Sequence, residues 1–150
     1  MGFRILVVDD SPVLRVMLSE MLQELGHEVV AEVESGNGAL EAYPKYKPDL
    51  VCLDISLPDI NGMEVLKKLR RSDPRANVLI VTGNDQKALE PEALSLRALG
   101  VLHKPFDAGE LKEMLERLTK LETVTGVLKH NQDLLLNPQE AEDVKDTRAS

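Results

Sequence analysis

The sequence predicts an α/β protein with a five-stranded, doubly wound parallel sheet. Short apolar runs recur along the chain, and most are continuous rather than alternating, which is typical of strands covered by helices on both faces. A segment with helical spacing of apolar residues follows each run, so strand and helix alternate with right-handed crossovers. The expected strands are Arg4–Val8, Glu28–Val33, Asp49–Ile55, Asn77–Thr82 and Gly100–His103.

The first two helices have recognisable boundaries. Ser11 and Pro12 favour a helix start, with Ser as N-cap and Pro in the first turn. Gly26 then ends that helix. A second helix around Gly38–Lys47 should be short or kinked, because Pro44 would break its interior. The apolar face of the first helix comprises Leu14, Met17, Leu18, Met21, Leu22 and Leu25.

Three further helices follow from the same spacing. Gly62 begins the third, Pro91 lies near the start of the fourth, and Asp107 caps the last. Their apolar faces are Met63, Leu66 and Leu69 for the third, Leu94, Leu96 and Leu99 for the fourth, and Leu111, Met114, Leu115, Leu118 and Leu121 for the last.

Composition restricts the class of protein. The chain has 150 residues, which suits one domain with its own core. A formal net charge of −8 argues against direct nucleic-acid binding, which needs clustered Lys and Arg. No apolar run approaches the ~18 residues of a membrane span, and the N-terminus lacks a signal-peptide pattern. Cys52 is the single cysteine, which excludes an internal disulfide, so we expect a cytoplasmic protein.

Polar residues end the predicted strands, at the edge where such sheets place their sites. They are Asp9 and Asp10, Asp54, Thr82 and Lys104. Taken singly, each residue could be a helix cap, a turn residue, a strand residue or a surface residue. Taken together, they converge on one edge of the predicted sheet. Three adjacent carboxylates repel one another unless a cation joins them, and Mg²⁺ prefers such hard oxygen ligands.

This set of residues suits phosphoryl chemistry. A carboxylate near a metal can act as a nucleophile and form an acyl phosphate. The phosphoryl oxygens then need a cation and hydrogen-bond donors, which Lys104 and Thr82 could supply.

Four motifs carry a family resemblance: "ILVVDDSP", "PDLVCLDISLPDINGMEVL", "VLIVTGN" and "GVLHKPFD". Over about residues 3–121 the chain resembles a response-regulator receiver domain of two-component signalling, of the stand-alone type. The resemblance implies the (βα)5 flavodoxin-like fold. It also implies that Asp54 is phosphorylated and that Asp9 and Asp10 are the acid pair, with Asp10 the more direct Mg²⁺ ligand.

Further roles follow from the same resemblance. Ser56 matches the position whose backbone carbonyl also binds the metal, so the implied ligands of Mg²⁺ (or Mn²⁺) are Asp9, Asp10, Asp54 and Ser56. Thr82 matches the switch hydroxyl, and Lys104 matches the lysine that precedes a cis proline.

The implied function is a switch rather than an enzyme. A sensor histidine kinase, a histidine phosphotransfer protein or a small phosphodonor would phosphorylate Asp54, and the protein would assist its own Mg²⁺-dependent phosphorylation and dephosphorylation. The added charge would draw Thr82 inward and alter a surface of the fourth helix, fifth strand and fifth helix. Binding of a downstream protein target would then change.

The chain departs from the family at one position. Members often carry Tyr or Phe three residues before the lysine, where this sequence has Val101. His103 should lie on the same strand face as Val101 and is an alternative reporter. Ser56 and Asn84 should flank the path of the attacking water and set the lifetime of the phosphoryl group.

The resemblance ends near Leu121, which predicts a receiver domain at 1–121 and a partly helical extension with a polar end at 122–150. A leucine stripe could form a homodimer through the last helix and tail. The apolar segment Asp133–Leu136 should dock on this chain or another.

Three other hypotheses remain at this stage. The chain could be a phosphatase of the haloacid-dehalogenase type, although that family carries Asp-x-Asp after its first strand, where this chain has adjacent Asp9 and Asp10. It could be a degenerate receiver that serves as a scaffold, or the receiver part of a longer regulator.

Overall fold

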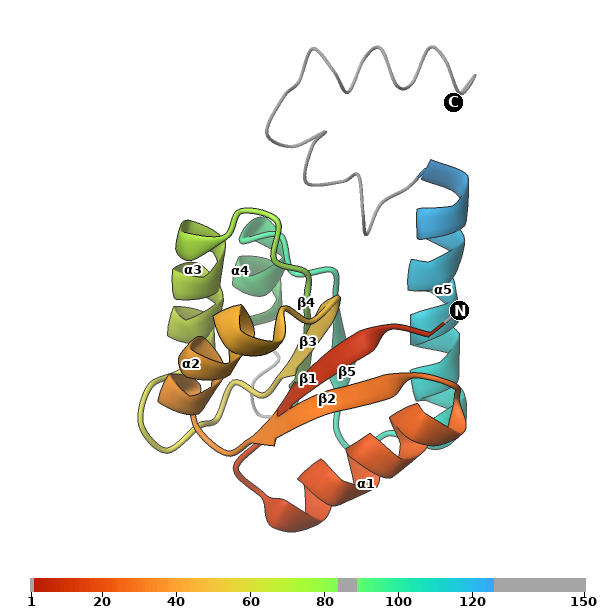
Figure 1. The fold of residues 1–150 in the computed structure, drawn as a ribbon, viewed down its shortest axis with the longest axis horizontal. Helices are drawn as coiled ribbons and strands as arrows, with labels where there is room; N and C mark the ends of the chain where they lie inside the picture. The colour runs from red at the N-terminus through yellow and green to blue at the C-terminus, as the bar shows by residue number, and fades with distance from the viewer. Residues whose placement is uncertain (1, 84–88, 126–150) are drawn as a thin grey trace.

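A computed structural model describes residues 2–83 and 89–125 of the chain. Figure 1 shows a twisted central sheet between two layers of helices. All strand pairs are parallel, and the strand order is β2-β1-β3-β4-β5, so the predicted doubly wound sheet is confirmed. The strands are β1 (Arg4–Val8), β2 (Glu28–Val33), β3 (Leu50–Leu53), β4 (Val78–Thr82) and β5 (Gly100–His103).

The helices cover both faces of the sheet. Helices α1 and α5 pack on one face, and α2, α3 and α4 pack on the other. Their bounds are α1 (Pro12–Glu24), α2 (Gly36–Tyr46), α3 (Gly62–Ser72), α4 (Glu90–Ser95) and α5 (Ala108–Thr125). Of the described residues, no helix has the length and apolarity needed to cross a membrane.

Alternation along the strands separates the core into two clusters. In β1, Leu6 and Val8 face α2 and α3, whereas Ile5 and Val7 face α1 and α5. All four side chains are at most 1% exposed, because helices cover both faces of this central strand. The continuous apolar runs therefore arise from burial on both sides.

Side chains cap the helices where the sequence predicts. The Leu14 N–H donates to the Ser11 hydroxyl, and Pro12 occupies the first turn of α1. At α5, the Glu110 N–H donates to the Asp107 carboxylate at 2.8 Å, and the Asp107 N–H donates to Glu110 at 3.1 Å. This reciprocal capping box satisfies two backbone donors that a helix end leaves unpaired.

The second helix was predicted to be short or kinked at Pro44, and the structure shows that it is not short. Helix α2 has 11 residues, as many as α3, and contains Pro44. Pro44 lies in the last turn, so its missing N–H removes a hydrogen bond only near the helix end. Ser35 caps the start of α2, and Ala39 and Ala42 are buried in the core beneath it.

The prediction for the fourth helix is wrong in extent. Helix α4 ends at Ser95, and Arg97 adopts a left-handed φ of 71° that turns the chain away from the helix. Leu96 packs with the cluster under α2–α4, whereas Leu99 packs on the opposite face, and Leu94 is 47% exposed. The three leucines therefore do not form one helical face.

Helix α5 continues to Thr125, beyond residue 121. The extension 122–150 was expected to be partly helical, and the domain boundary near residue 121 stays a prediction. Predictions for Asn84, for Asp133–Leu136 and for dimerisation through the tail concern residues outside the described ranges.

Candidate functional site

The carboxyl ends of four neighbouring strands meet at one edge of the sheet. Asp9 follows β1, Asp54 follows β3, Thr82 is the last residue of β4, and Lys104 follows β5. Backbone hydrogen bonds fix these positions, because the Asp54 N–H donates to the Val8 carbonyl at 3.0 Å and the Lys104 N–H donates to the Thr82 carbonyl at 2.6 Å. The sheet register therefore brings the predicted residues to one edge.

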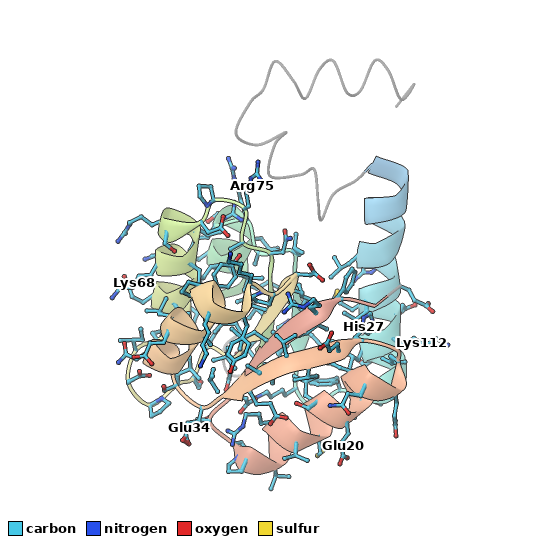
Figure 2. All side chains as sticks on the ribbon, in the orientation of Figure 1. Glu20, His27, Glu34, Lys68, Arg75 and Lys112 are labelled. Atoms are coloured by element: carbon cyan, nitrogen blue, oxygen red, sulfur yellow. The ribbon has the colours of Figure 1, made fainter. Side chains whose placement is uncertain are left out.

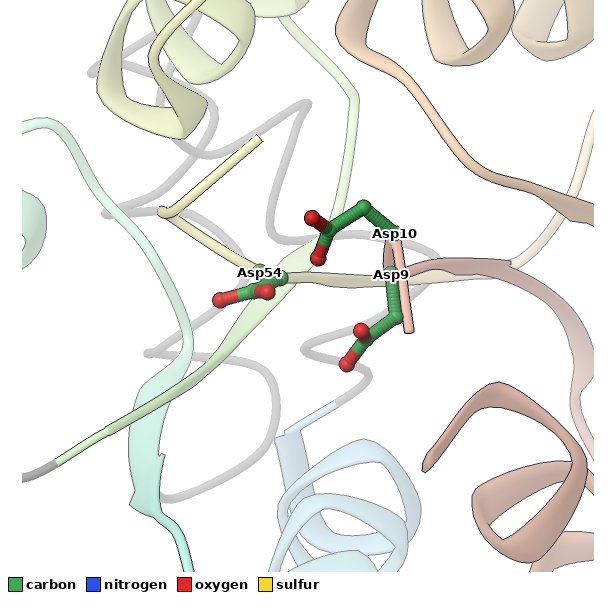
Figure 3. A group of neighbouring side chains, drawn as sticks. All are labelled: Asp9, Asp10 and Asp54. Atoms are coloured by element: carbon green, nitrogen blue, oxygen red, sulfur yellow. The ribbon is translucent and has the colours of Figure 1, made fainter. Parts of the chain in front are cut away.

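Three carboxylates form the acidic cluster of Asp9, Asp10 and Asp54. One oxygen from each lies within 4.8 Å of the other two, and Figure 3 shows the three side chains converging from two strand ends. Asp9 and Asp54 are only 2% and 4% exposed, whereas Asp10 faces solvent. The predicted convergence of these carboxylates is confirmed.

Lys104 connects the two buried carboxylates. Its Nζ donates to Asp9 Oδ2 at 2.8 Å and lies 3.4 Å from Asp54 Oδ2. The bond between Lys104 and Pro105 is cis, as the resemblance implied. One ammonium therefore faces two carboxylates, and a net negative charge is left in a largely buried site.

Burial and neighbouring charges act on the pKa of Asp54 in opposite directions, and the pKa is raised overall. Desolvation raises the pKa of the Asp54 carboxyl above its usual range, the Lys104 ammonium lowers it, and the Asp9 carboxylate raises it again. The Ser56 N–H also donates to Asp54 Oδ1 at 3.2 Å and favours the charged form. An additional cation would relieve the cost of ionised Asp54.

Thr82 places a buried hydroxyl at the same edge. The residue is 1% exposed, and its Oγ1 has no hydrogen-bond partner in the part of the chain that the structure describes. An unsatisfied buried hydroxyl costs about 1–3 kcal/mol. A ligand oxygen arriving at the rim would provide the missing acceptor.

The donor set suits a hard divalent cation. Carboxylate oxygens are the ligands that Mg²⁺ prefers, and Mn²⁺ accepts the same set. The acidic cluster offers three such groups. Ser56 follows Asp54 closely and is exposed, so it lies beside the cluster, while the role of its carbonyl as a metal ligand stays a prediction.

Arg15 supports the site and was not identified from the sequence. Its Nη1 donates to the Asp9 carbonyl at 2.7 Å, and its Nε lies 3.6 Å from Glu32 of β2. The Ser11 N–H donates to Asp9 Oδ1 at 2.9 Å. Arg15 thus fixes the turn that presents the acid pair, a role that helical spacing alone does not reveal.

Asp59 and Gly62 support the acceptor loop. The Asp59 carboxylate accepts hydrogen bonds from the N–H groups of Gly36 and Asn37, both at 2.8 Å, and these bonds lower the pKa of Asp59 to about 2. A Cβ on Gly62 would collide with the backbone of Asp54 and Ile55. The sequence predicted Gly62 only as a helix start, because its close approach to the backbone of Asp54 and Ile55 depends on the folded structure.

Val101 and His103 lie on the same strand face, as alternation predicts. Val101 packs against the cluster under α2–α4, and His103 Nε2 lies 3.0 Å from Glu90 Oε1 at the start of α4. His103 is the ladder partner of Thr82. A polar contact therefore connects β5 to α4 on the face where relatives of the resembled family often carry an aromatic ring.

Comparisons with known proteins identify the family of this chain. Residues 5–116 match the family model of the response regulator receiver domain. The chemotaxis protein CheY of Thermotoga maritima is 35% identical over 120 residues, covering 80% of this chain and 100% of that protein. The sporulation initiation phosphotransferase F of Bacillus subtilis is 32% identical over 123 residues, covering 82% and 98%.

Solved structures give the same result. The REC domain of AraT, a response regulator from Geobacillus stearothermophilus, superposes with a TM-score of 0.73 at 32% identity, covering 82% of this chain and 98% of that one. The signal receiver domain of the response regulator NarL from Mycobacterium tuberculosis gives 0.72 at 29% identity, covering 79% and 97%.

Proposed function

This chain belongs to the family of response regulator receiver domains, which are phosphorylation-activated signalling switches, and we propose that Asp54 is its phosphoryl acceptor. The observation that carries the proposal is the buried Asp54 carboxylate, 3.4 Å from Lys104 Nζ and beside Asp9 and Asp10. The acceptor follows β3, whereas a haloacid-dehalogenase nucleophile would follow β1. This difference favours the switch over the phosphatase hypothesis.

The residues around Asp54 divide the work of transfer. A carboxylate oxygen of Asp54 attacks the phosphorus, the bond from phosphorus to the donor breaks, and an aspartyl phosphate forms. Receiver domains bind Mg²⁺ at an acidic pocket, and when bound here it would neutralise charge on Asp9, Asp10 and Asp54. Lys104 stabilises the negative phosphoryl oxygens, and the Thr82 hydroxyl donates a hydrogen bond to one of them.

Return to the resting state uses the same residues. Water attacks the phosphorus of the aspartyl phosphate, and the bond from phosphorus to the Asp54 oxygen breaks. The Asp54 carboxylate is regenerated, and inorganic phosphate leaves with the protons of the water. Lys104 again stabilises the phosphoryl charge, so the domain assists both directions without acting on an external substrate. Ser56 lies exposed beside Asp54, where its side chain can affect the approach of water.

Helix α1 offers a docking surface for the phosphodonor protein. Val13, Leu14, Val16 and Met17 are 38–67% exposed although they are apolar. A cavity of about 330 Å³, lined in part by Leu14, Met17 and Phe106, extends from this face to Asp9 and Lys104. A sensor histidine kinase or histidine phosphotransfer protein that covered this face would place its phosphohistidine near Asp54.

Output follows from the charge that phosphorylation adds. A protein phosphate carries about −1.5 to −2 charges at neutral pH, and we expect it to draw the Thr82 hydroxyl inward. Thr82 pairs with His103 in the β4–β5 ladder, and His103 contacts Glu90 of α4. The signal would thus reach the surface of α4, β5 and α5 and change the binding of a downstream protein.

Acetyl phosphate with Mg²⁺ tests the acceptor directly. Intact-mass spectrometry should show the gain of one phosphoryl group in the natural sequence and none in Asp54→Ala. The matched control is Glu41→Ala, an exposed carboxylate on α2 that should leave phosphorylation intact. Persistent phosphorylation of Asp54→Ala would refute the assignment, and sustained turnover of an external phosphoester would instead support the phosphatase.

A further inference from the structure

A second cavity lies at the pole opposite Asp54. It has a volume of about 700 Å³ and lies between the C-terminal parts of α2 and α3. Leu40, Tyr43, Pro44 and Leu69 give it an apolar floor. The Tyr43 hydroxyl donates to Asp73 at 2.8 Å, so the polar end of this ring already has its partner and the ring presents an apolar surface.

Basic side chains surround the mouth of this cavity. Lys47 and Lys68 line it, are exposed, and form no ion pair with another described residue. The lining also contains Arg75 and two carboxylates, so its three cationic side chains exceed its two anionic ones by one. Both carboxylates already accept hydrogen bonds, Asp73 from Tyr43 and Asp49 from a backbone N–H at 2.8 Å. Figure 2 shows Lys68 on the outer surface of α3. The mouth therefore suits a ligand with a carboxylate beside an apolar group.

The C-terminal end of α5 lies at the same pole. The cavity includes Phe3, Asp49 and Asn77, which immediately precede β1, β3 and β4. Helix α5 begins beyond the carboxyl end of β5 and runs back for 18 residues, about 27 Å. The strands have 4–6 residues and span about 13–20 Å, so α5 passes the amino edge of the sheet.

We propose that this cavity binds the chain's own C-terminal segment at Asp133–Leu136, with the three leucines on the apolar floor and the carboxylate facing Lys47 and Lys68. This segment is the Asp-Leu-Leu-Leu run of the sequence beyond the family match. The proposal concerns a different surface from the phosphoryl site and does not depend on the function proposed for Asp54.

Chain length and charge support this occupant. Seven residues lie between Thr125 and Asp133, so the eight steps from one to the other reach about 26–29 Å when extended. A domain of ~120 residues has a radius of gyration of about 14 Å. Residues 126–150 are acidic, which complements the basic mouth. Their acids are Asp133, Glu140, Glu142, Asp143 and Asp146, and their bases are Lys129, Lys145 and Arg148.

Lysine acylation tests the proposal in the full-length chain. A limiting amount of an amine-reactive ester is applied, and peptide mass spectrometry gives the rate at each lysine. Lys47 and Lys68 should react at least about threefold more slowly in the full chain than in a chain ending at Thr125, as a mostly bound segment requires. Lys112, exposed at the start of α5, should react equally in both and serves as the internal control.

Two tail variants of the full chain separate docking from other effects of truncation. The triple variant L134S/L135S/L136S should restore the reactivity of Lys47 and Lys68, whereas Val144→Ser in the same tail should leave both protected. Equal reactivity with and without the tail would overturn the proposal. Protection that increased with protein concentration would also overturn it, because the occupant would then be a second copy.

Discussion

Replacing Lys104 by Met should destabilise the metal-free protein strongly. Methionine keeps most of the length of the side chain but removes the ammonium that lies 2.8 Å from Asp9 Oδ2 and 3.4 Å from Asp54 Oδ2. At an effective dielectric constant of about 20, these distances correspond to gross attractions of about 6 and about 5 kcal/mol. Desolvation offsets much of this attraction, so the measured loss will be smaller.

The expected loss is about 3 kcal/mol. Removing one partner of a buried ion pair costs about 3–5 kcal/mol, because the other charge is left uncompensated. We expect the lower end of this range for Lys104→Met, because the Lys104 side chain is 18% exposed. The side chains of Asp9 and Asp54 are only 3% and 6% exposed. Urea unfolding near pH 7 in the presence of a chelator measures the difference in free energy.

Mg²⁺ supplies the decisive comparison for this variant. If the acidic cluster holds the cation, Mg²⁺ should stabilise Lys104→Met more than the natural protein, because the ion then replaces the missing ammonium. A concentration of 100 times Kd stabilises by about 2.7 kcal/mol. Lys112→Met, on the exposed face of α5, should lose less than ~0.5 kcal/mol. Equal stability of Lys104→Met and the natural protein in chelator would refute the reasoning.

Three other changes test separate parts of the site. Without metal near pH 7, Asp54→Asn should be more stable than the natural protein, because burial raises the Asp54 pKa and the folded state disfavours the carboxylate. The difference in unfolding free energy should shrink as the pH falls through that raised pKa. Urea unfolding at several pH values measures this difference, and a difference that grew in acid would contradict the prediction. Gly62→Ala should cost about 1–3 kcal/mol by overpacking against the Asp54 backbone and should slow phosphorylation. Gly109→Ala should cost less, because its Cβ would meet only a side-chain oxygen of Asp107 at 3.3 Å, and should leave phosphorylation unchanged. Asp59→Asn should lower the thermal midpoint near neutral pH by weakening the two hydrogen bonds at the start of α2. Because the pKa of Asp59 is depressed to about 2, the natural protein should lose this advantage only as the pH falls from about 4 to about 2, which a pH series of melting curves would check.

The sequence predicted the strand ends well because burial leaves a simple pattern. Strands β1 and β3 are covered on both faces, so their runs are continuously apolar and a charged residue follows each. The third strand was predicted to reach Ile55, but it ends at Leu53, just before Asp54. Asp9 and Asp54 could therefore be placed at one edge before any coordinates were known. Lys104 followed in the same way from the end of β5.

Tertiary geometry explains what the sequence did not predict. The spacing of Leu94, Leu96 and Leu99 suits a helix, but the left-handed turn at Arg97 sends the last two leucines to opposite faces of the sheet. Arg15 reads as an ordinary surface residue of α1 until its contact with the Asp9 carbonyl is seen. Such contacts depend on side-chain direction across the fold, which one-dimensional patterns do not contain.

Two like charges at the end of a buried strand destabilise any fold, and in this site the residues around them compensate those charges only in part. The Lys104 ammonium contacts both Asp9 and Asp54, and burial raises the pKa of Asp54. The Thr82 hydroxyl has no hydrogen-bond partner within the described structure. A phosphoryl group on Asp54 would supply that acceptor and compete for Lys104. Since the N–H of Lys104 donates to the Thr82 carbonyl, any shift of one residue acts directly on the other. This unfavourable resting arrangement would make the edge of the sheet sensitive to a phosphoryl group on Asp54.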